Sequence, residues 1–228
     1  MGTGYVGLVT GSCLADFGNT VVCVDIDQQR IGKLKDGESP IYEPGLDELI
    51  ARNVDRGRLT FSSEVAFAIK TSEIIFICVG TPPMPTGDVD MSFVTGAAKM
   101  IGEFMEDHKI VVNKSTVPVG TGVDVSEVIR REKPDQDFDV VSNPEFLREG
   151  SAIDDFLHPD RLVIGATSKR AMEAILDVYN PLFEHDVPMV LTDVESAEMI
   201  KYASNALLAA KISFINEIFN FFFYFFVI

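Results

Sequence analysis

Short apolar runs alternate with amphipathic segments along most of the chain. Runs typical of β-strands cover 20–26, 59–61, 74–79, 109–113, 138–142, 161–165 and 189–191, and helical spacing covers 8–17, 28–35, 46–53, 64–70, 92–106, 123–131 and 169–180. This order predicts an α/β fold: a Rossmann-like, doubly wound parallel sheet with helices on both faces. Helical spacing then continues without a breaker, so we expect one domain over 1–193 and the start of a helical unit over 194–228.

The glycine-rich turn at the start of the chain carries the strongest functional signal. Its sequence is Gly-Thr-Gly-Tyr-Val-Gly, and Asp25 closes the apolar run at 21–24. Gly2 allows a tight turn, Gly4 lets a pyrophosphate approach the backbone, and Gly7 lets helix and strand pack closely. Asp25 would bind the adenosine ribose, and its charge disfavours a 2′-phosphate. The pattern therefore predicts a dinucleotide site that selects NAD over NADP.

One residue, Met1, precedes this turn in the sequence. A Rossmann unit begins with an apolar strand of about five residues. We therefore expect the sheet to lack or to shorten its central first strand, next to the nucleotide site.

Composition narrows the possible partners. The net charge of −16, from 19 basic and 35 acidic residues, argues against nucleic-acid binding, because phosphate contacts need clustered Lys and Arg. An anionic cofactor can still bind at a helix N-terminus. Cys13, Cys23 and Cys78 have no metal-ligand spacing, which favours reduced thiols and no metal site. No signal-peptide pattern is visible, so we expect a cytoplasmic protein.

The end of the sequence is rich in phenylalanine. Residues 219–228 are apolar on every side, and Asn216, Glu217 and Asn220 interrupt the approach to them. Ten residues are too few to span a bilayer, so we expect no membrane association, with a membrane anchor as the less favoured alternative. We interpret the stretch as a non-native or frame-shifted end of a truncated chain, prone to aggregation where exposed.

Candidate chemistry gathers in loops that follow strands. Besides the glycine turn, loops 79–83, 114–120 and 142–150 all lie at the carboxyl edge of the predicted sheet, where α/β proteins bind ligands. Glu145 and Glu149 would lie one turn apart if a helix begins after Pro144, and such a pair can hold a water or take a proton. A solvated acidic turn is the alternative interpretation.

A second candidate lies on the final helix. Lys201 and Asn205 are four residues apart, with Glu198 one turn earlier on the same face. A lysine in this setting can donate to a developing alkoxide. The neighbouring residues are mainly alanine and leucine, so we expect Lys201 to be shielded from bulk water rather than to be an ordinary surface lysine.

Several motifs occur together in one order: the glycine turn, Val-Asp-Ile-Asp, Ile-Tyr-Glu-Pro-Gly-Leu, Val-Gly-Thr-Pro, Lys-Ser-Thr-Val-Pro-Val-Gly-Thr, Ser-Asn-Pro-Glu-Phe-Leu-Arg-Glu-Gly and Glu-Met-Ile-Lys-Tyr-Ala-Ser-Asn-Ala. From Gly2 to about Ile218 the chain resembles the N-terminal half of the UDP-glucose/GDP-mannose dehydrogenase family. The resemblance implies two successive NAD-dependent oxidations at C6 of UDP-glucose, which give UDP-glucuronate. It also implies that the final helix begins a helical dimerisation domain.

The resemblance assigns roles to residues by motif. It implies NAD contacts from Gly2, Gly4, Tyr5, Val6, Gly7, Asp25, Arg30, Thr81, Thr116 and Glu149. It implies that Thr116 and Glu145 position the catalytic water and that Lys201, with Asn205 beside it, stabilises oxyanions. The sugar-nucleotide site would be lined by Glu145, Phe146, Leu147, Arg148, Glu149, Lys201 and Asn205.

The chain departs from the family pattern in one chemical respect. The family's nucleophilic cysteine lies in a Gly-Gly-Ser-Cys-Phe-Pro-Lys-Asp context, which no segment here matches, and the rest of the dimerisation domain and the C-terminal nucleotide-sugar domain are not in the sequence. We therefore expect no net conversion of UDP-glucose by this chain alone. The resemblance implies a homodimer for the family, and the sequence leaves open whether this chain forms it. The alternatives are a GDP-mannose dehydrogenase, a β-hydroxyacid dehydrogenase-like enzyme, and a non-catalytic NAD-binding fragment.

Overall fold

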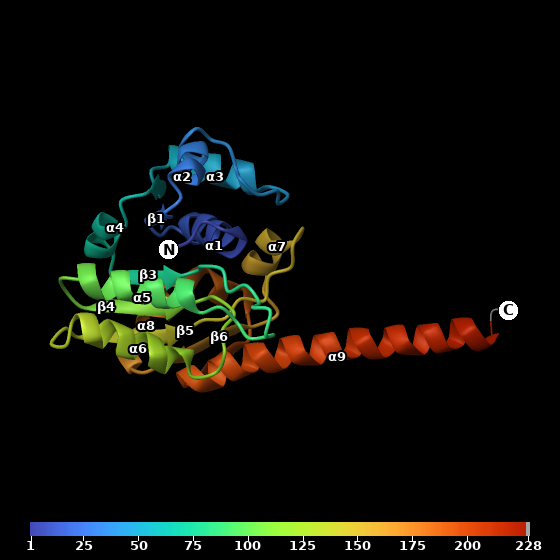
Figure 1. The fold of residues 1–228 in the computed structure, drawn as a ribbon. Coiled ribbons are helices and arrows are strands. Elements are labelled where there is room, and N and C mark those ends of the chain that lie inside the picture. The colour runs from blue at the N-terminus through green and yellow to red at the C-terminus, as the bar shows by residue number, and fades with distance from the viewer. Residues whose placement is uncertain (227–228) are drawn as a thin grey trace.

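Two layers of helices enclose a sheet that is split into two pieces, and one long helix projects from the domain (Figure 1). The computed structural model describes residues 1–226. The strands are β1 (Val21–Val24), β2 (Leu59–Ser62), β3 (Ile74–Ile77), β4 (Lys109–Asn113), β5 (Phe138–Ser142), β6 (Leu162–Ala166) and β7 (Met189–Thr192). The helices are α1 (Tyr5–Asp16), α2 (Gln28–Lys35), α3 (Leu46–Asp55), α4 (Val65–Thr71), α5 (Ser92–Phe104), α6 (Thr121–Glu132), α7 (Ala152–Leu157), α8 (Lys169–Val178) and α9 (Val194–Phe226), with a 3-10 turn at Asn180–His185.

The Rossmann-like α/β fold is confirmed, and each expected strand and helix is present with small shifts at its ends. The strand β4 is buried along its whole length, because α5 and α6 cover one face and the α1 side covers the other. The helix α1 begins at Tyr5, three positions before the expected start at residue 8. Gly4 is in an extended conformation immediately before it and forms the N-cap.

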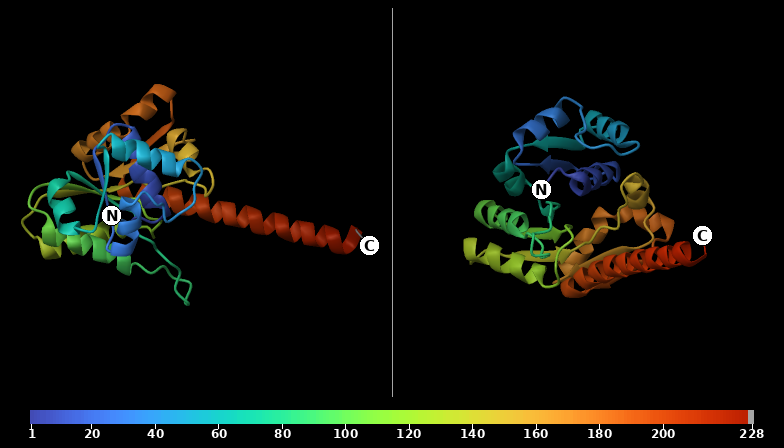
Figure 2. Two further views of the ribbon diagram at one scale, coloured as in Figure 1. Left: turned by 90° about the horizontal axis from the view of Figure 1, so that it is seen from above. Right: turned by 45° about the vertical axis from the view of Figure 1, so that its right-hand side comes forward.

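The sheet is interrupted where the first strand of such a fold would lie. β1 and β2 form one parallel pair, and β3 to β7 form a separate five-stranded sheet. Met1 and Gly2 lie between the two pieces: the Met1 ammonium donates to Phe76 O at 2.7 Å, Cys78 N donates to Met1 O at 2.8 Å, and Gly2 N donates to Val24 O at 2.8 Å. Figure 2 shows the N-terminus in this position from two further directions.

The last two strands reverse direction, which the sequence pattern did not indicate. β6 pairs antiparallel with β5 through Val141–Ala166 and Ser142–Gly165, and β7 runs parallel to β6. The chain between β5 and β6 stays at the carboxyl edge of the sheet, where α7 packs against α1. β6 therefore starts beyond the end of β5 and runs back toward it.

The helix α9 packs on the domain only through its first turns. Gly122 and Gly165 allow this close packing because they lack side chains: a Cβ at Gly122 would lie 2.4 Å from Val194 Cγ1, and one at Gly165 would lie 2.7 Å from Ala197 Cβ. From Tyr202 onward the helix is largely exposed, including the phenylalanines up to Phe223. Residues 227–228 of the phenylalanine-rich stretch lie outside the described residues.

Length and composition alone would let this helix cross a bilayer. Within the span Val194–Tyr224, an 18-residue window has a mean hydropathy of 1.4, and none of that window is buried. The sequence argument counted only the ten residues 219–228 as apolar, but the same helix is also largely apolar before residue 219. A single helix of this kind is weak evidence for a membrane span.

Candidate active site

The glycine turn creates an open helix N-terminus. Gly2 has a φ of +90°, and a Cβ there would lie 2.9 Å from Cys78 O. A Cβ at Gly7 would lie 1.9 Å from Gly2 O, so the helix can approach the turn only because this residue has no side chain. Among residues 1–226, a Cβ at Gly4 would meet no atom within 4 Å, and no side chain caps the helix there. The first N–H groups of α1 thus have no side-chain acceptor at the cap, which suits a phosphate anion.

Asp25 is held directly against this turn. Its Oδ2 accepts from Thr3 N at 2.7 Å and Thr3 Oγ1 at 2.9 Å, and its Oδ1 accepts from Asp27 N at 3.0 Å. Arg30 Nη1 lies 3.7 Å away. Burial alone would raise the pKa of Asp25, but these hydrogen bonds and the Arg30 charge outweigh it and hold the pKa below its ordinary value. A carboxylate therefore stands beside the glycine turn, as the sequence predicted.

Hydroxyl groups join loop 79–83 to loop 114–120. Thr81 Oγ1 donates to Thr116 O at 2.9 Å, and Ser115 Oγ donates to Val79 O at 2.7 Å. Both contacts connect the ends of β3 and β4, which are neighbours in the sheet. The carboxyl edge thus presents Thr81 and Thr116 together, both half-buried.

A charged cluster connects loops 114–120 and 142–150 to α9. Lys201 Nζ lies 2.9 Å from Glu145 Oε1 and also donates to Glu145 O at 2.5 Å. Thr116 Oγ1 lies 3.5 Å from the same Oε1. Both charged side chains are about nine-tenths buried, at 10% and 11% exposure, and the Phe146 ring lies 5.1 Å from the Lys201 ammonium. The arrangement provides a cation, a carboxylate and a hydroxyl within contact of one another.

The apolar neighbours on α9 do not bury Lys201. Ala203, Ala206 and Leu207 are exposed, and the 144–147 loop shields the lysine instead. Asn205 lies one turn further along the helix and is exposed, and its side chain has no hydrogen bond to residues 1–226. The structure therefore places Lys201 in the cluster and leaves Asn205 outside it.

The expected pairing of Glu145 with Glu149 on one helical face is wrong. No helix follows Pro144; α7 begins at Ala152. Glu145 Oε2 accepts from Leu147 N at 2.7 Å, so this carboxylate folds back over its own loop and faces Lys201. Glu149 is exposed in a turn. A residue-spacing argument fails here because the local hydrogen bond competes with helix formation.

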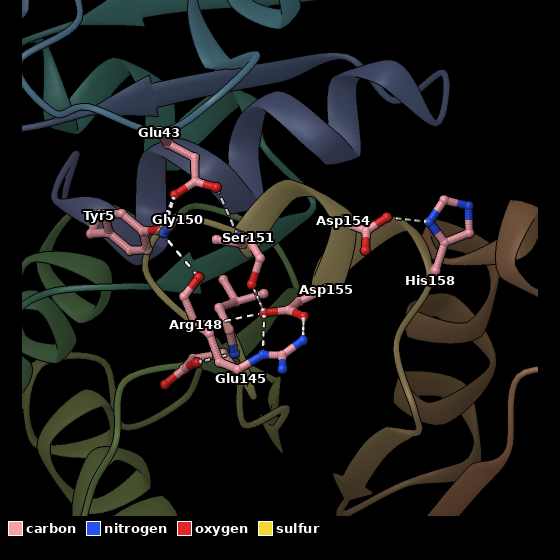
Figure 3. Close-up of polar contacts among 11 residues, drawn as sticks. Tyr5, Glu43, Glu145, Arg148, Gly150, Ser151, Asp154, Asp155 and His158 are labelled. Carbon is pink, nitrogen blue, oxygen red and sulfur yellow. Dashed lines mark hydrogen bonds and ion pairs between the residues drawn. The ribbon is translucent and has the colours of Figure 1, made fainter.

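Glu43 is a buried carboxylate that sequence reasoning missed. Its side chain accepts from the Tyr5 hydroxyl, from Gly150 N at 2.8 Å and from Ala152 N at 2.8 Å (Figure 3). Burial raises the pKa of Tyr5 to about 12, and the Glu43 hydrogen bond adds to the shift. The contact joins the first turn of α1 to the 148–152 segment. The sequence signal was the motif Ile-Tyr-Glu-Pro-Gly-Leu, whose glutamate was given no role.

The other predicted substrate-lining residues have separate environments. Arg148 is exposed and donates to the Asp155 carboxylate through its backbone N at 2.8 Å and its Nε at 3.2 Å (Figure 3). Phe146 is stacked under Arg161, whose Cζ lies 4.2 Å from the ring centre. Leu147 packs against the core and Val6 is half-buried in the first turn of α1.

A buried lysine lies behind the charged cluster. Lys114 Nζ donates to Asn143 Oδ1 at 3.1 Å and to the Tyr179 hydroxyl at 3.3 Å. Burial lowers its pKa to about 8. With Glu145 and Phe146 it lines a cavity of about 40 Å³. The residue lies in a motif that carries the family resemblance, but hydropathy alone gave no sign that it is buried.

Sequence comparison identifies related domains. Residues 1–183 match the model of the UDP-glucose/GDP-mannose dehydrogenase family, NAD binding domain, and residues 195–223 match that family's central domain. UDP-glucose 6-dehydrogenase TuaD of Bacillus subtilis (strain 168) is 54% identical over 96% of this chain and 47% of its own length. The UDP-glucose 6-dehydrogenase of Rhizobium meliloti (strain 1021) is 52% identical over 96% of this chain and 51% of its own length.

Solved structures give the same relationship. A UDP-glucose dehydrogenase from Pyrobaculum islandicum superposes with a TM-score of 0.91 at 43% identity, over 95% of this chain and 50% of that one. A GDP-mannose dehydrogenase from Pseudomonas aeruginosa, solved as a ternary complex, gives 0.89 at 38% identity over the same shares. The chain thus spans about half the length of the relatives it matches.

Proposed function

The chain belongs to the UDP-glucose/GDP-mannose dehydrogenase family, and we propose that it forms the NAD-binding half of an NAD-dependent UDP-glucose 6-dehydrogenase. The relatives at 54% and 52% identity carry that name, whereas the GDP-mannose dehydrogenase structure is 38% identical. Family membership excludes the β-hydroxyacid dehydrogenase alternative. GDP-mannose is the second candidate substrate, and the lower identity makes it the weaker one.

The glycine turn and the neighbouring loops would hold NAD. The N-terminus of α1 at Gly4 would take the pyrophosphate, and Asp25, beside Arg30, would take the adenosine ribose. Thr81 and Thr116 would contact the cofactor at the carboxyl edge. Bound NAD supplies the hydride acceptor for oxidation at C6.

The observation that carries the proposal is the charged cluster at Lys201. Its ammonium, held 2.9 Å from Glu145 Oε1, is placed to stabilise a negatively charged substrate oxygen. Glu145 and Thr116 would position the catalytic water, and the Glu145 carboxylate would take its proton. The loop from Phe146 to Glu149, which runs from this cluster to the Gly150–Tyr5 contact, would line the sugar-nucleotide site partly through its backbone.

The second oxidation needs a nucleophilic thiolate, and the cysteines of this chain are unsuited to that role. Cys13, Cys23 and Cys78 are all buried, and burial raises the pKa of Cys13 and Cys23 to about 12. We therefore propose that this chain alone binds NAD without net conversion of UDP-glucose to UDP-glucuronate. A cytoplasmic location agrees with three reduced thiols, and the exposed α9 is the surface on which a homodimer would form.

Calorimetric titration tests the cofactor assignment. The purified chain should release heat on titration with NAD and much less with NADP, and Asp25→Asn should narrow that difference. A folded chain, verified by circular dichroism, that binds neither nucleotide would refute the proposal. UDP-glucuronate formed by chain free of host enzyme would refute the expected lack of net conversion.

A further inference from the structure

The N-terminus of α6 is capped by a residue of α9. Gly120 is the N-cap of α6 and has no side chain with which to accept from the first N–H groups of that helix. The Glu198 carboxylate takes this place: its Oε2 accepts from Gly120 N at 2.7 Å, and its Oε1 accepts from Gly122 N at 2.8 Å. Glu198 is 2% exposed and follows Gly120 by 78 residues, so the cap joins two elements that are distant in the chain (Figure 1).

The position of Glu198 on α9 relates this cap to the charged cluster. Lys201 follows Glu198 by three residues, which is roughly 4.5 Å along the helix axis and places both side chains on one face. Glu198 reaches the end of loop 114–120, whereas Lys201 reaches Glu145 in loop 142–150. A single turn of α9 therefore contacts both loops through charged side chains.

Loop 114–120 links the two contacts from the other side. Thr116 Oγ1 lies 3.5 Å from Glu145 Oε1, which is the oxygen that also faces Lys201. The contacts thus close a ring that runs from Glu198 through the loop and Thr116 to Glu145, and back to α9 at Lys201. A displacement of α9 at Glu198 would consequently change the distance between the Lys201 ammonium and the Glu145 carboxylate.

We propose that Glu198 is a positioning residue for the charged cluster: its carboxylate fixes α9 against the first turn of α6 and so sets the place of the Lys201 ammonium beside Glu145. Glu198 forms its hydrogen bonds with α6 rather than with the cluster, so it acts through Lys201. The inference rests on the proposed function, in which this ammonium stabilises a substrate oxygen.

Site-specific acetylation of lysines by acetic anhydride, quantified by mass spectrometry, tests this role, because a lysine that leaves its buried ion pair reacts faster. The rate at Lys201 is divided by the rate at Lys211, which is exposed on the same helix. Glu198→Gln replaces one acceptor oxygen by a donor, so this ratio should rise about tenfold, the factor that corresponds to one lost hydrogen bond to a charged group. Glu195→Gln removes the same charge from an exposed position of α9, and as the matched control it should leave the ratio unchanged.

A third lysine separates local displacement of α9 from a general loss of structure. Lys109 is 1% exposed at the start of β4 and should keep its low reactivity in Glu198→Gln. If Glu198→Gln does not fold, as judged by circular dichroism, Glu198→Asp takes its place. That variant keeps the charge on a side chain one methylene shorter, so it should raise the Lys201 ratio by about twofold or more.

Three results would overturn the positioning role. They are an unchanged Lys201 ratio in the folded variant, a rise that Lys109 shares, and an equal rise in Glu195→Gln. The labelling needs no ligand, so its result is separate from the test of the proposed function. A wild-type chain that binds no NAD would refute the proposed function, whereas an unchanged Lys201 ratio would refute the role of Glu198 and leave the cofactor assignment standing.

Discussion

Replacing Glu43 by alanine should destabilise the domain more than any surface charge change. The carboxylate is 5% exposed and accepts two backbone N–H groups, from Gly150 and Ala152, as well as the Tyr5 hydroxyl. A hydrogen bond to a charged group contributes about 1.5–3 kcal/mol, and a buried donor left without its acceptor, here the Ala152 N–H, costs about 1–3 kcal/mol more. We therefore expect a loss of about 3–5 kcal/mol in the free energy of unfolding.

Urea denaturation followed by far-UV circular dichroism measures this loss. Glu103→Ala, an exposed glutamate on α5, is the matched control and should change stability by less than about 0.5 kcal/mol. Glu43→Gln should give an intermediate loss, because one of the two acceptor oxygens is replaced by a donor. A Glu43→Ala variant as stable as the control would refute the assigned hydrogen-bond network.

Acidification supplies a second test of the same residue. Burial would raise the pKa of Glu43, but its hydrogen bonds from Tyr5, Gly150 and Ala152 outweigh this and lower it. A carboxylate with a lowered pKa adds stability above its unfolded pKa, about 4.3, and this stability is lost as the pH falls through the folded value. The stability difference between wild type and Glu43→Ala should therefore shrink below pH about 4.3, and a constant difference would contradict the reasoning.

Three further predictions concern other parts of the site. Gly7→Ala should lose more than about 3 kcal/mol of stability in urea denaturation, because its Cβ would lie 1.9 Å from a carbonyl oxygen, whereas Gly4→Ala should stay folded and show only weaker NAD binding by calorimetry. Burial lowers the pKa of Lys114 from its ordinary value of 10.5 to about 8, so the stability of the wild type relative to Lys114→Met should rise as the pH increases from 8 to 10.5. Stability profiles of the two proteins that stay parallel over this pH range would contradict this reasoning. Lys201→Met and Glu145→Gln should show a coupling energy of about 1–3 kcal/mol in a double-mutant cycle, and additivity would mean that the ion pair contributes nothing.

Local chemistry made the glycine turn and most element positions predictable. Gly2 needs a positive φ and Gly7 needs to lack a side chain, and such requirements show directly in the sequence. The apolar character of β3 and β4 likewise indicated buried strands. The position of Asp25 beside the turn followed from its place at the end of an apolar run.

Contacts made across the fold were not predictable in this way. The partner of Glu145 is a lysine on α9, and the local bond to Leu147 prevents the helix that spacing suggested. The burial of Lys201 depends on a distant loop rather than on its helical neighbours. The backbone partners of Glu43, Gly150 N and Ala152 N, lie more than a hundred residues further along the chain, so no local pattern could reveal them. The reversal of β6 depends on the path of the preceding loop.

The small contact between α9 and the domain has a mechanical consequence. The first turns of the helix pack at Gly122 and Gly165, and Lys201 lies within two turns of that contact. The rest of the helix extends far from the domain (Figure 1). Lys201 lies close to the point about which α9 would rotate. A rotation that moves the exposed end of the helix a long way therefore displaces the Lys201 ammonium only slightly, so the ion pair with the Glu145 carboxylate tolerates such motion.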